Sequence, residues 1–220
     1  MSKKFEIAKM GFANGVAADY PLTDKEKQLM IMDAADAFGK FLDALKCDWR
    51  NDPNSDNTPK RVAKAYVNDL WAGRYQAPPS ITGFPSDGYD GIVQESNIPL
   101  TSMCSHHHQT IQGVVSIAYI ASETGTVVGL SKLNRIVEYF GRRGAIQEQL
   151  TVAIHNAVDQ ICTGNKGVAV MVSATHNCVS CRGVGHAGAS MQTAKLTGSF
   201  LEEDSCRAEF YKNIELASKK

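Results

Sequence analysis

The sequence lacks a surplus of charge of either sign. Lys and Arg together number 23, as do Asp and Glu, so the formal net charge at pH 7 is +0. Without a global electrostatic field, general attraction to nucleic acid or to an anionic membrane is not expected. Any anionic ligand would therefore have to be bound by basic residues that the fold gathers locally.

Long apolar runs are also missing. A membrane-spanning helix needs about 20 consecutive apolar residues, and the sequence contains no such stretch. The N-terminal stretch is basic, but it lacks both the apolar core and the small-residue cleavage site of a secretory signal. We therefore expect a cytoplasmic protein that contacts no membrane and no nucleic acid.

Cysteine is too scarce and too irregularly placed for a disulfide scaffold. The six cysteines stand at positions 47, 104, 162, 178, 181 and 206 of a chain of 220 residues, which is long enough to bury a sizeable core. Reduced thiols are expected, some of them as metal ligands. Internal repeats and low-complexity tracts are absent as well.

The first part of the chain has a helical pattern. Apolar residues recur at helical spacing from about Asp24 to Leu45 and again from Thr58 to about Ala72. Residues 1–22 have weak periodicity and are interpreted as an arm. A connection rich in Gly, Pro and Ser covers residues 73–90. We predict a boundary there, with an N-terminal arm and helical segment over residues 1–90.

The remainder, residues 91–220, alternates strands and helices and is predicted to form the catalytic domain. A long helical stripe runs from Leu130 to Ile161 and is interrupted near Gly141 to Gly144. Runs with β-branched residues predict strands. These strands cover residues 92–101, 110–121 and 168–175.

Two of the predicted strands end in clusters of Cys and His. The first delivers Cys104-Ser105-His106-His107-His108, and the last delivers His176-Asn177-Cys178. Thiolate and imidazole are the ligands that zinc prefers, and a catalytic zinc site uses three of them and leaves one position open. Cys104, one imidazole of the triplet and Cys178 would form such a site. The surplus imidazoles His106 and His176 indicate acid–base chemistry, because imidazole titrates near neutral pH.

Other interpretations of the same residues stay open at this point. A single Cys or His is most often a packed or solvated residue. A closed structural zinc site is the stronger rival, because Cys178 and Cys181 form a C-x-x-C pair that could supply a fourth ligand.

Four separated motifs carry a resemblance to a known family. In order, they read TSMCSHHHQTIQG, GLSKLNRIVEYFGRRG, AIQEQLT and ATHNCVSCRGV, and they are preceded by TPKRVAKAYVNDLWAG. The chain resembles GTP cyclohydrolase I over about residues 58–215. The motifs agree with that family in both order and spacing, whereas the first 57 residues match only as a divergent helical arm.

The resemblance implies an α+β fold, the tunnelling fold. In this fold an antiparallel four-stranded sheet with two helices on one face assembles with its copies into an oligomeric barrel, here with an N-terminal helical extension. The family implies a homo-oligomer, a decameric ring, whose active sites lie between subunits. It also implies the reaction, in which GTP and water give formate and 7,8-dihydroneopterin triphosphate.

The resemblance also assigns residues. It implies Zn²⁺ held by Cys104, His107 and Cys178, with His106 and His176 as catalytic proton carriers. A glutamate that accepts from the N1–H and the 2-amino group of guanine would be Glu148, with Gln147 beside it near the same site. The residues implied to contact the triphosphate are Ser131, Lys132, Arg135 and Arg182.

The chain departs from the family at several positions. Ser105 stands where a glutamate is usual, and Cys181 stands where an apolar residue is expected. His108 and Gly144 are likewise unusual, and His108 leaves the register of the imidazoles ambiguous. The alternatives are a tunnelling-fold enzyme that acts on a different guanine nucleotide, a sibling that binds a purine or pterin for other chemistry, and a non-catalytic zinc-stabilised assembly or regulatory subunit.

Overall fold

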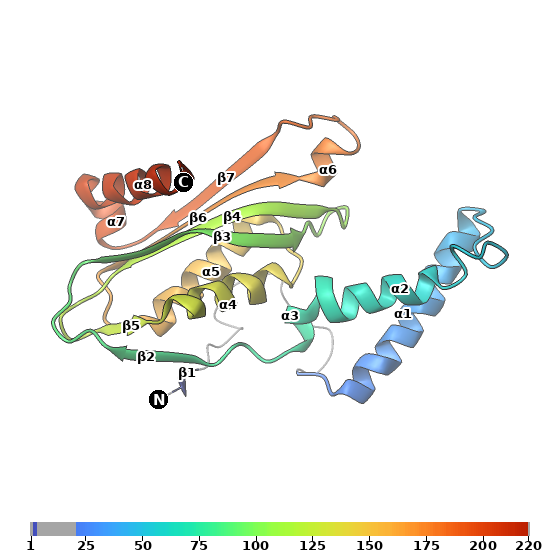
Figure 1. The fold of residues 1–220 in the computed structure, drawn as a ribbon, viewed down its shortest axis with the longest axis horizontal. Helices are drawn as coiled ribbons and strands as arrows, with labels where there is room; N and C mark the ends of the chain where they lie inside the picture. The colour runs from blue at the N-terminus through green and yellow to red at the C-terminus, as the bar shows by residue number, and fades with distance from the viewer. Residues whose placement is uncertain (1, 4–20, 220) are drawn as a thin grey trace. The chain divides into compact units, whose positions relative to one another are not determined.

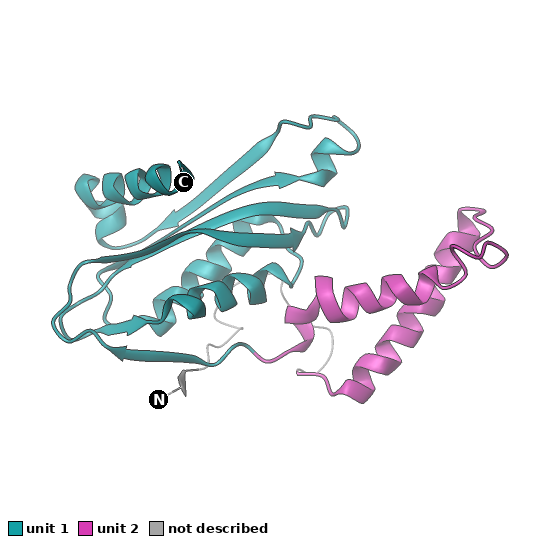
Figure 2. Ribbon diagram, viewed as in Figure 1, with its two compact units in different colours: residues 1–14, 78–220 teal, residues 15–77 magenta. Residues whose placement is uncertain are grey.

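The computed structural model describes residues 2–3 and 21–219 of the chain (Figure 1). These residues belong to two compact units. One unit spans residues 15–77, and the other combines residues 1–14 with residues 78–220 (Figure 2).

The two units divide inside the stretch that the sequence predicts as a connection, between residues 77 and 78. The assignment of residues 1–90 to an N-terminal segment and of residues 91–220 to a catalytic domain stays a proposal. The predicted arm over residues 1–22 lies almost wholly outside the described residues.

The described part of the unit of residues 15–77, which begins at residue 21, is helical as predicted. Helix α1 (Asp24–Ala44) begins with a capping box, in which the Thr23 hydroxyl accepts from the Glu26 N–H and the Glu26 carboxylate accepts from the Thr23 N–H. The second predicted helix is divided into α2 (Thr58–Ala65), a π-helical turn η2 (Tyr66–Leu70) and α3 (Ala72–Tyr75).

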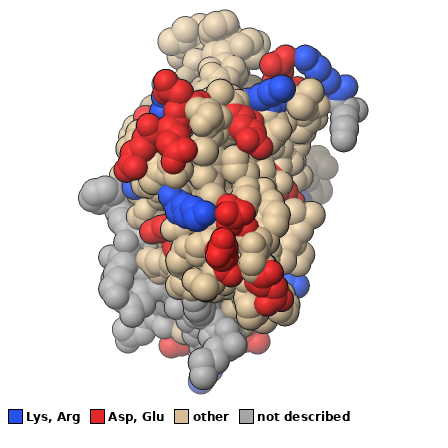
Figure 3. Space-filling model, turned by 90° about the vertical axis from the view of Figure 1, so that its left-hand side faces the viewer, with Lys and Arg blue, Asp and Glu red and all other residues tan. Residues whose placement is uncertain are grey.

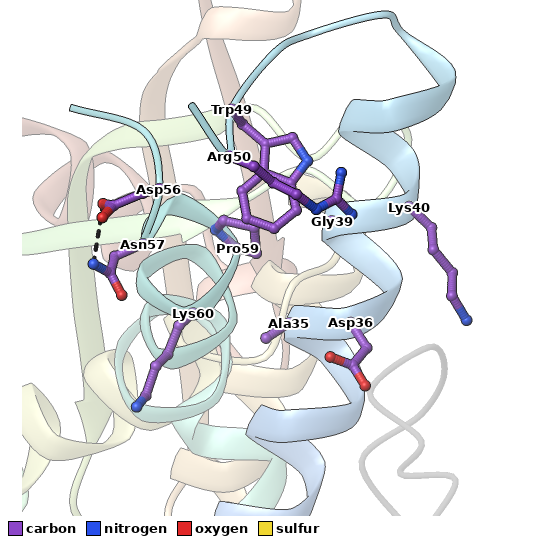
Figure 4. Close-up of a pocket in the computed structure, with 10 residues that line it drawn as sticks. All are labelled: Ala35, Asp36, Gly39, Lys40, Trp49, Arg50, Asp56, Asn57, Pro59 and Lys60. Carbon is purple, nitrogen blue, oxygen red and sulfur yellow. Dashed lines mark hydrogen bonds between the residues drawn. The ribbon is translucent and has the colours of Figure 1, made fainter. Parts of the chain in front are cut away.

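A loop tryptophan packs against α1 in this unit. The Trp49 indole donates to Asp43 at 2.9 Å, and the Arg50 guanidinium lies 4.3 Å from the Trp49 ring centre. A Cβ added to Gly39 would lie 3.0 Å from the Trp49 ring and 3.8 Å from Pro59, so the glycine makes room for the indole. Gly39, Trp49, Arg50 and Pro59 line a hollow whose other lining residues include both acidic and basic side chains (Figure 4).

The other unit is built on a four-stranded antiparallel sheet in the order β3-β4-β6-β7. The sequence predicted three of its strands, whereas β7 was not predicted. Gly113 is required where β4 meets β6, because a Cβ there would lie 2.0 Å from the Ser173 carbonyl oxygen. The strands are β3 (Ile92–Met103), β4 (Thr110–Ile120), β6 (Gly167–His176) and β7 (Ser190–Leu196).

Two helices cover one face of this sheet, and a third lies on the other face (Figure 1). Helices α4 (Leu130–Gly141) and α5 (Gln147–Ile161) separate where the sequence predicted the break. Their apolar side chains form the main core with the inward residues of the strands. On the opposite face, Phe210 of α8 (Asp204–Ser218) packs with Phe200 and with Ala118 and Ala169 of the sheet. The α+β fold with an antiparallel sheet and two helices on one face is confirmed.

Smaller elements complete this unit, and one of them corrects the sequence analysis. The predicted connection over residues 73–90 contains strand β2 (Ile81–Pro85), which was missed because its Gly and Pro residues are typical of turns. It pairs with two short strands in a separate three-stranded sheet. The remaining elements are β1 (Ser2–Lys3), β5 (Thr126–Val128), α6 (Asn177–Ser180) and α7 (Ser199–Glu202).

Acidic and basic side chains lie interspersed on the face shown in Figure 3. None of the helices within the described ranges is both long enough and apolar enough to span a membrane.

Candidate active site

The C-terminal ends of β3 and β6 lie at the same end of the four-stranded sheet. Strands β3 and β4 are paired neighbours, and Ile111 of β4 pairs with His176, the last residue of β6. Cys104 directly follows β3, and Cys178 lies in the short helix α6 that follows β6. The antiparallel register therefore brings together two segments that are far apart in the sequence.

Cys104, His176 and Cys178 each direct one ligand atom to the same place, and they are called the Cys–His group below. These three atoms lie within 4.8 Å of one another. Cys104 is only 4% exposed, whereas the other two residues are half-buried. Two sulfurs and one imidazole nitrogen are a donor set that suits zinc and leaves a fourth position for another ligand. The residues present therefore fit a zinc ion.

The histidine triplet lies on the exposed turn between β3 and β4. The Cys104 N–H donates to the Gln109 carbonyl at 2.9 Å, and the His108 N–H donates to the Cys104 carbonyl at 3.0 Å. His108 has a positive φ of 52°, which closes the turn. His107 lies outside the Cys–His group, where the structure instead supplies His176. The roles of His107 as a zinc ligand and of His106 as a proton carrier stay predictions.

The two thiols of the Cys–His group influence each other. Burial raises the pKa of the Cys178 thiol, and the neighbouring Cys104 thiol raises it further. Two adjacent thiolates would repel each other, which disfavours the charged form of Cys178. A metal ion favours the deprotonated form of its cysteine ligands, and binding would release their protons.

Burial of His176 favours the neutral form of its imidazole. Burial lowers the pKa of its imidazole, although the Glu148 carboxylate acts in the opposite direction. Its Nε2 lies 2.7 Å from the Oε1 of Gln147, and its Nδ1 lies 4.0 Å from the sulfur of Cys178. A neutral imidazole can accept a proton, as the predicted acid–base role requires.

Gln147 and Glu148 are neighbours at the start of α5, but their side chains differ in environment. Gln147 is fully buried and bonded to protein groups, whereas Glu148 is exposed close to His176. Glu148 is therefore the one of the two that a ligand in solution can reach directly. Its role in guanine recognition stays a prediction.

Arg182 lies beside the Cys–His group. It follows α6, is exposed, and donates to the Cys178 carbonyl at 3.3 Å. A guanidinium there can bind an anion that enters the site from solvent.

The other three predicted triphosphate contacts lie elsewhere in the chain. Ser131, Lys132 and Arg135 belong to the first turns of α4. Beside them, Asn134 donates at 2.6 Å to Glu95, in the first half of β3. Cys104 follows the other end of that strand, and strands rise about 3.3 Å per residue, which places Cys104 roughly 25–30 Å from Glu95. Within one chain, these three residues are not brought to the Cys–His group.

Two hydroxyls next to this site were not predicted from the sequence. Thr193 of β7 and Thr151 of α5 lie 2.6 Å apart, and the Thr193 hydroxyl is 3.1 Å from the Nε2 of Gln147. Thr151 is the last residue of the AIQEQLT motif and lies one turn after Gln147 in α5, whereas no sequence motif marks Thr193. Thr193 approaches Gln147 only because β7 pairs with β6 in the register that places Thr193 opposite Val172.

The chain is similar to a family of known enzymes. A family model described as GTP cyclohydrolase I matches residues 34–215. A protein of Shewanella loihica named GTP cyclohydrolase 1 is 39% identical over 176 residues, which cover 79% of this chain and 80% of the relative. A protein of the same name from Aeromonas salmonicida is 40% identical over 77% of this chain and 77% of its own length. Another from an Enterobacter species is 40% identical over 80% of this chain and 78% of its own length.

Proposed function

We propose a function from the family to which this chain belongs, which is GTP cyclohydrolase I. The chain converts GTP and water to formate and 7,8-dihydroneopterin triphosphate, the first step of pterin biosynthesis. One structural observation carries the proposal. Cys104, His176 and Cys178 converge at the point where two family motifs meet in the fold. The cytoplasmic location expected from the sequence stays a prediction.

Zinc is the metal that this site would hold. Cys104 and Cys178 would bind it through their thiolates, together with an imidazole from His107 or His176. When bound, zinc would supply a hydroxide at neutral pH by lowering the pKa of a coordinated water. A zinc site with an open fourth position is supported by the contact of Cys181, the candidate fourth ligand. Its sulfur donates instead to the Asn177 carbonyl at 2.6 Å.

The histidines would move protons during the reaction. His176 is neutral and lies beside Cys178, so it can accept a proton at its Nδ1. His106, on the exposed turn, would carry protons during ring opening and the later rearrangement of the sugar. Opening the imidazole ring requires protonation at one point and deprotonation at another, which two imidazoles can share.

Guanine recognition is assigned to Glu148. A carboxylate accepts from the N1–H and the 2-amino group of guanine together, whereas adenine does not present these two donors. The exposure of Glu148 near His176 supports this role. Its position would direct the guanine ring toward the Cys–His group.

We further propose that each active site is completed by a second copy of the chain. Ser131, Lys132 and Arg135 lie far along β3 from Cys104 within one chain, yet they match triphosphate-binding positions of the family. Within the part of the chain that the structure describes, β3 and β7 are the edge strands of the four-stranded sheet, where a neighbouring copy can pair. This arrangement supports a homo-oligomer with active sites between subunits, and the decameric ring implied by the family stays a prediction.

The test is direct. Zinc-loaded protein is incubated with GTP, and formate release is measured together with the absorbance of the pterin. We expect both products in equal amounts, with no activity after the zinc is chelated and recovery when zinc is restored. Bound zinc without either product would contradict the proposed function.

A further inference from the structure

The side-chain amide of Gln147 has one possible orientation. Its nitrogen lies 3.2 Å from the Val172 carbonyl, 3.0 Å from the Met191 carbonyl and 3.1 Å from the Thr193 hydroxyl. Carbonyl oxygens only accept hydrogen bonds, so the atom that faces them has to be the NH₂ group. The amide oxygen therefore points the other way, to the Nε2 of His176 at 2.7 Å.

Two hydroxyls reinforce this orientation. The Thr151 hydroxyl donates to the Gln147 backbone carbonyl at 2.8 Å, which uses its only proton. In its 2.6 Å contact with Thr193, Thr151 is therefore the acceptor and Thr193 the donor. The Thr193 oxygen is then left to accept from the amide of Gln147. The three residues are thus linked in a ring of hydrogen bonds, in which the two amide protons of Gln147 are shared among three acceptors, the Val172 and Met191 carbonyls and the Thr193 hydroxyl.

We propose that Gln147, Thr193 and Thr151 are positioning residues that set the tautomer of His176. An amide oxygen only accepts, so the Nε2 of His176 has to carry the proton of the neutral ring. Its Nδ1 is then unprotonated, and this nitrogen faces the sulfur of Cys178 at 4.0 Å. An unprotonated nitrogen is the form in which imidazole accepts a proton or binds a metal. The ring of hydrogen bonds thus presents a lone pair to the Cys–His group.

This role differs from the substrate contact that the sequence predicted for Gln147. The residue is 0% exposed, and both polar atoms of its side chain are bonded to protein groups. A guanine ring could reach the amide only by breaking these bonds. The kinetic consequence of the inference rests on the proposed function, whereas the tautomer can be measured without any substrate.

The experiment compares three substitutions in the zinc-loaded, full-length protein. Gln147→Met keeps the size of the side chain but removes the acceptor for Nε2–H, and Thr193→Val removes only the hydroxyl. Thr193→Ser retains that hydroxyl as the conservative variant. Thr197→Val is the matched structural control, because the Thr197 hydroxyl lies 3.1 Å from His155, a buried histidine outside the site.

Two readouts distinguish positioning from simple packing. The ¹⁵N resonances of the His176 ring report which nitrogen is protonated, and they are recorded alongside zinc content. We expect the wild type and Thr193→Ser to show a protonated Nε2, and Gln147→Met to lose that preference. In formate release, kcat should fall about 10- to 100-fold for Gln147→Met and by less for Thr193→Val, with KM for GTP unchanged. Thr197→Val should retain wild-type kcat.

Several results would overturn the inference. One is a wild-type His176 protonated on Nδ1; another is an unchanged tautomer in Gln147→Met. A raised KM with unchanged kcat would instead make Gln147 a substrate contact. If Gln147→Met does not fold, Thr193→Val is used in its place. A kcat of Thr193→Val equal to that of Thr193→Ser would then contradict the positioning role. An inactive wild type would contradict the proposed function, while the ¹⁵N resonances would still decide the tautomer.

Discussion

The Cys181 thiol lies outside the Cys–His group although it closely follows Cys178 in the sequence. Its sulfur donates to the Asn177 carbonyl at 2.6 Å and lies 3.6 Å from the side-chain oxygen of Gln109. Cys104 and Cys178, in contrast, lie beside each other and beside His176. Cys181 could become the fourth ligand of a closed zinc site only if the turn after β6 rearranged.

Substitution of the two nearby cysteines should therefore have opposite outcomes. Cys178→Ser removes a ligand, so we expect loss of bound zinc and a fall in formate release of about 100-fold or more. Cys181→Ser should retain both zinc and activity. Zinc content by elemental analysis and the formate assay are measured on the same preparations. Zinc loss from Cys181→Ser would favour the closed structural site.

Replacement of Glu148 should separate nucleotide binding from zinc binding. Glu148→Ala removes an acceptor for two guanine donors, and each charge-assisted hydrogen bond is worth about 1.5–3 kcal/mol. We expect GTP affinity to fall by about 100-fold or more, with zinc content unchanged. Calorimetric titration with GTP measures this effect. Glu148→Gln, which keeps one acceptor, should give an intermediate loss, and wild-type affinity in Glu148→Ala would refute the assigned role.

Among the elements, those with a strong local pattern were predictable from the sequence. Helices α1, α4 and α5 carry apolar residues at helical spacing, and β3, β4 and β6 carry β-branched runs. Strand β7 is largely polar and lies at a sheet edge, so its alternation is weak. Strand β2 forms only because it has distant partners, and its own residues favour turns.

Some residues of the candidate site were likewise predictable from the sequence, and others were not. Cys104 and Cys178 were predictable because each lies at the end of a strand with a clear pattern, and two such ends can meet at one sheet edge. The place of His176 among the donor atoms was not predicted, because it depends on side-chain orientation rather than on spacing. The contact between Gln147 and Thr193 depends on the register of β7, which no local pattern reveals.

At the start of α1, the capping box should determine local stability. Thr23→Ala removes the hydroxyl that accepts from the Glu26 N–H, which typically costs about 1 kcal/mol. The amide of Glu26 should then exchange its hydrogen about fivefold faster. Hydrogen exchange by mass spectrometry detects this in the first turn. Thr23→Ser keeps the hydroxyl and should exchange like the wild type, and equal rates in all three proteins would contradict the capping role.

The stability of the whole molecule should decrease in mild acid because of a buried histidine. His155 is 2% exposed, and burial lowers the pKa of its imidazole. The groups around it are Thr197, Asn156, Lys195 and Asp159, and the positive charge of Lys195 also disfavours protonation. In the unfolded chain the imidazole regains an ordinary pKa of about 6.5, so the unfolded state binds more protons below that pH.

We therefore expect the free energy of unfolding to be highest above pH 6.5 and to decrease as the pH falls toward 5. Urea denaturation at a series of pH values measures this dependence. His155→Gln cannot titrate, so its stability should change less over the same range. Contributions shared by both proteins, including those from the zinc ligands, cancel in the comparison. Parallel pH profiles for the two proteins would show that His155 does not cause the effect.

The proposed sharing of active sites between copies predicts complementation. In one chain, Cys178 lies at the end of the sheet that also carries Cys104, whereas Arg135 lies on α4 beside the opposite end of β3. If one site takes Cys178 from one copy and Arg135 from its neighbour, Cys178→Ser and Arg135→Ala each inactivate every site in their own oligomer. In oligomers formed by co-expression of both variants, some sites combine two intact halves.

Random mixing of the two variants in equal amounts leaves both halves intact in about a quarter of the sites of a symmetric ring. We therefore expect the co-expressed variants to release formate at about a quarter of the wild-type rate, while each variant expressed separately is nearly inactive. A chain that carries both substitutions, co-expressed with Cys178→Ser, is the control and should stay inactive, because every site then lacks Cys178. Two different inactive chains can restore activity only if each active site takes residues from both. If co-expression gives no gain in formate release, the triphosphate contacts lie within one chain or Arg135 is not part of the active site.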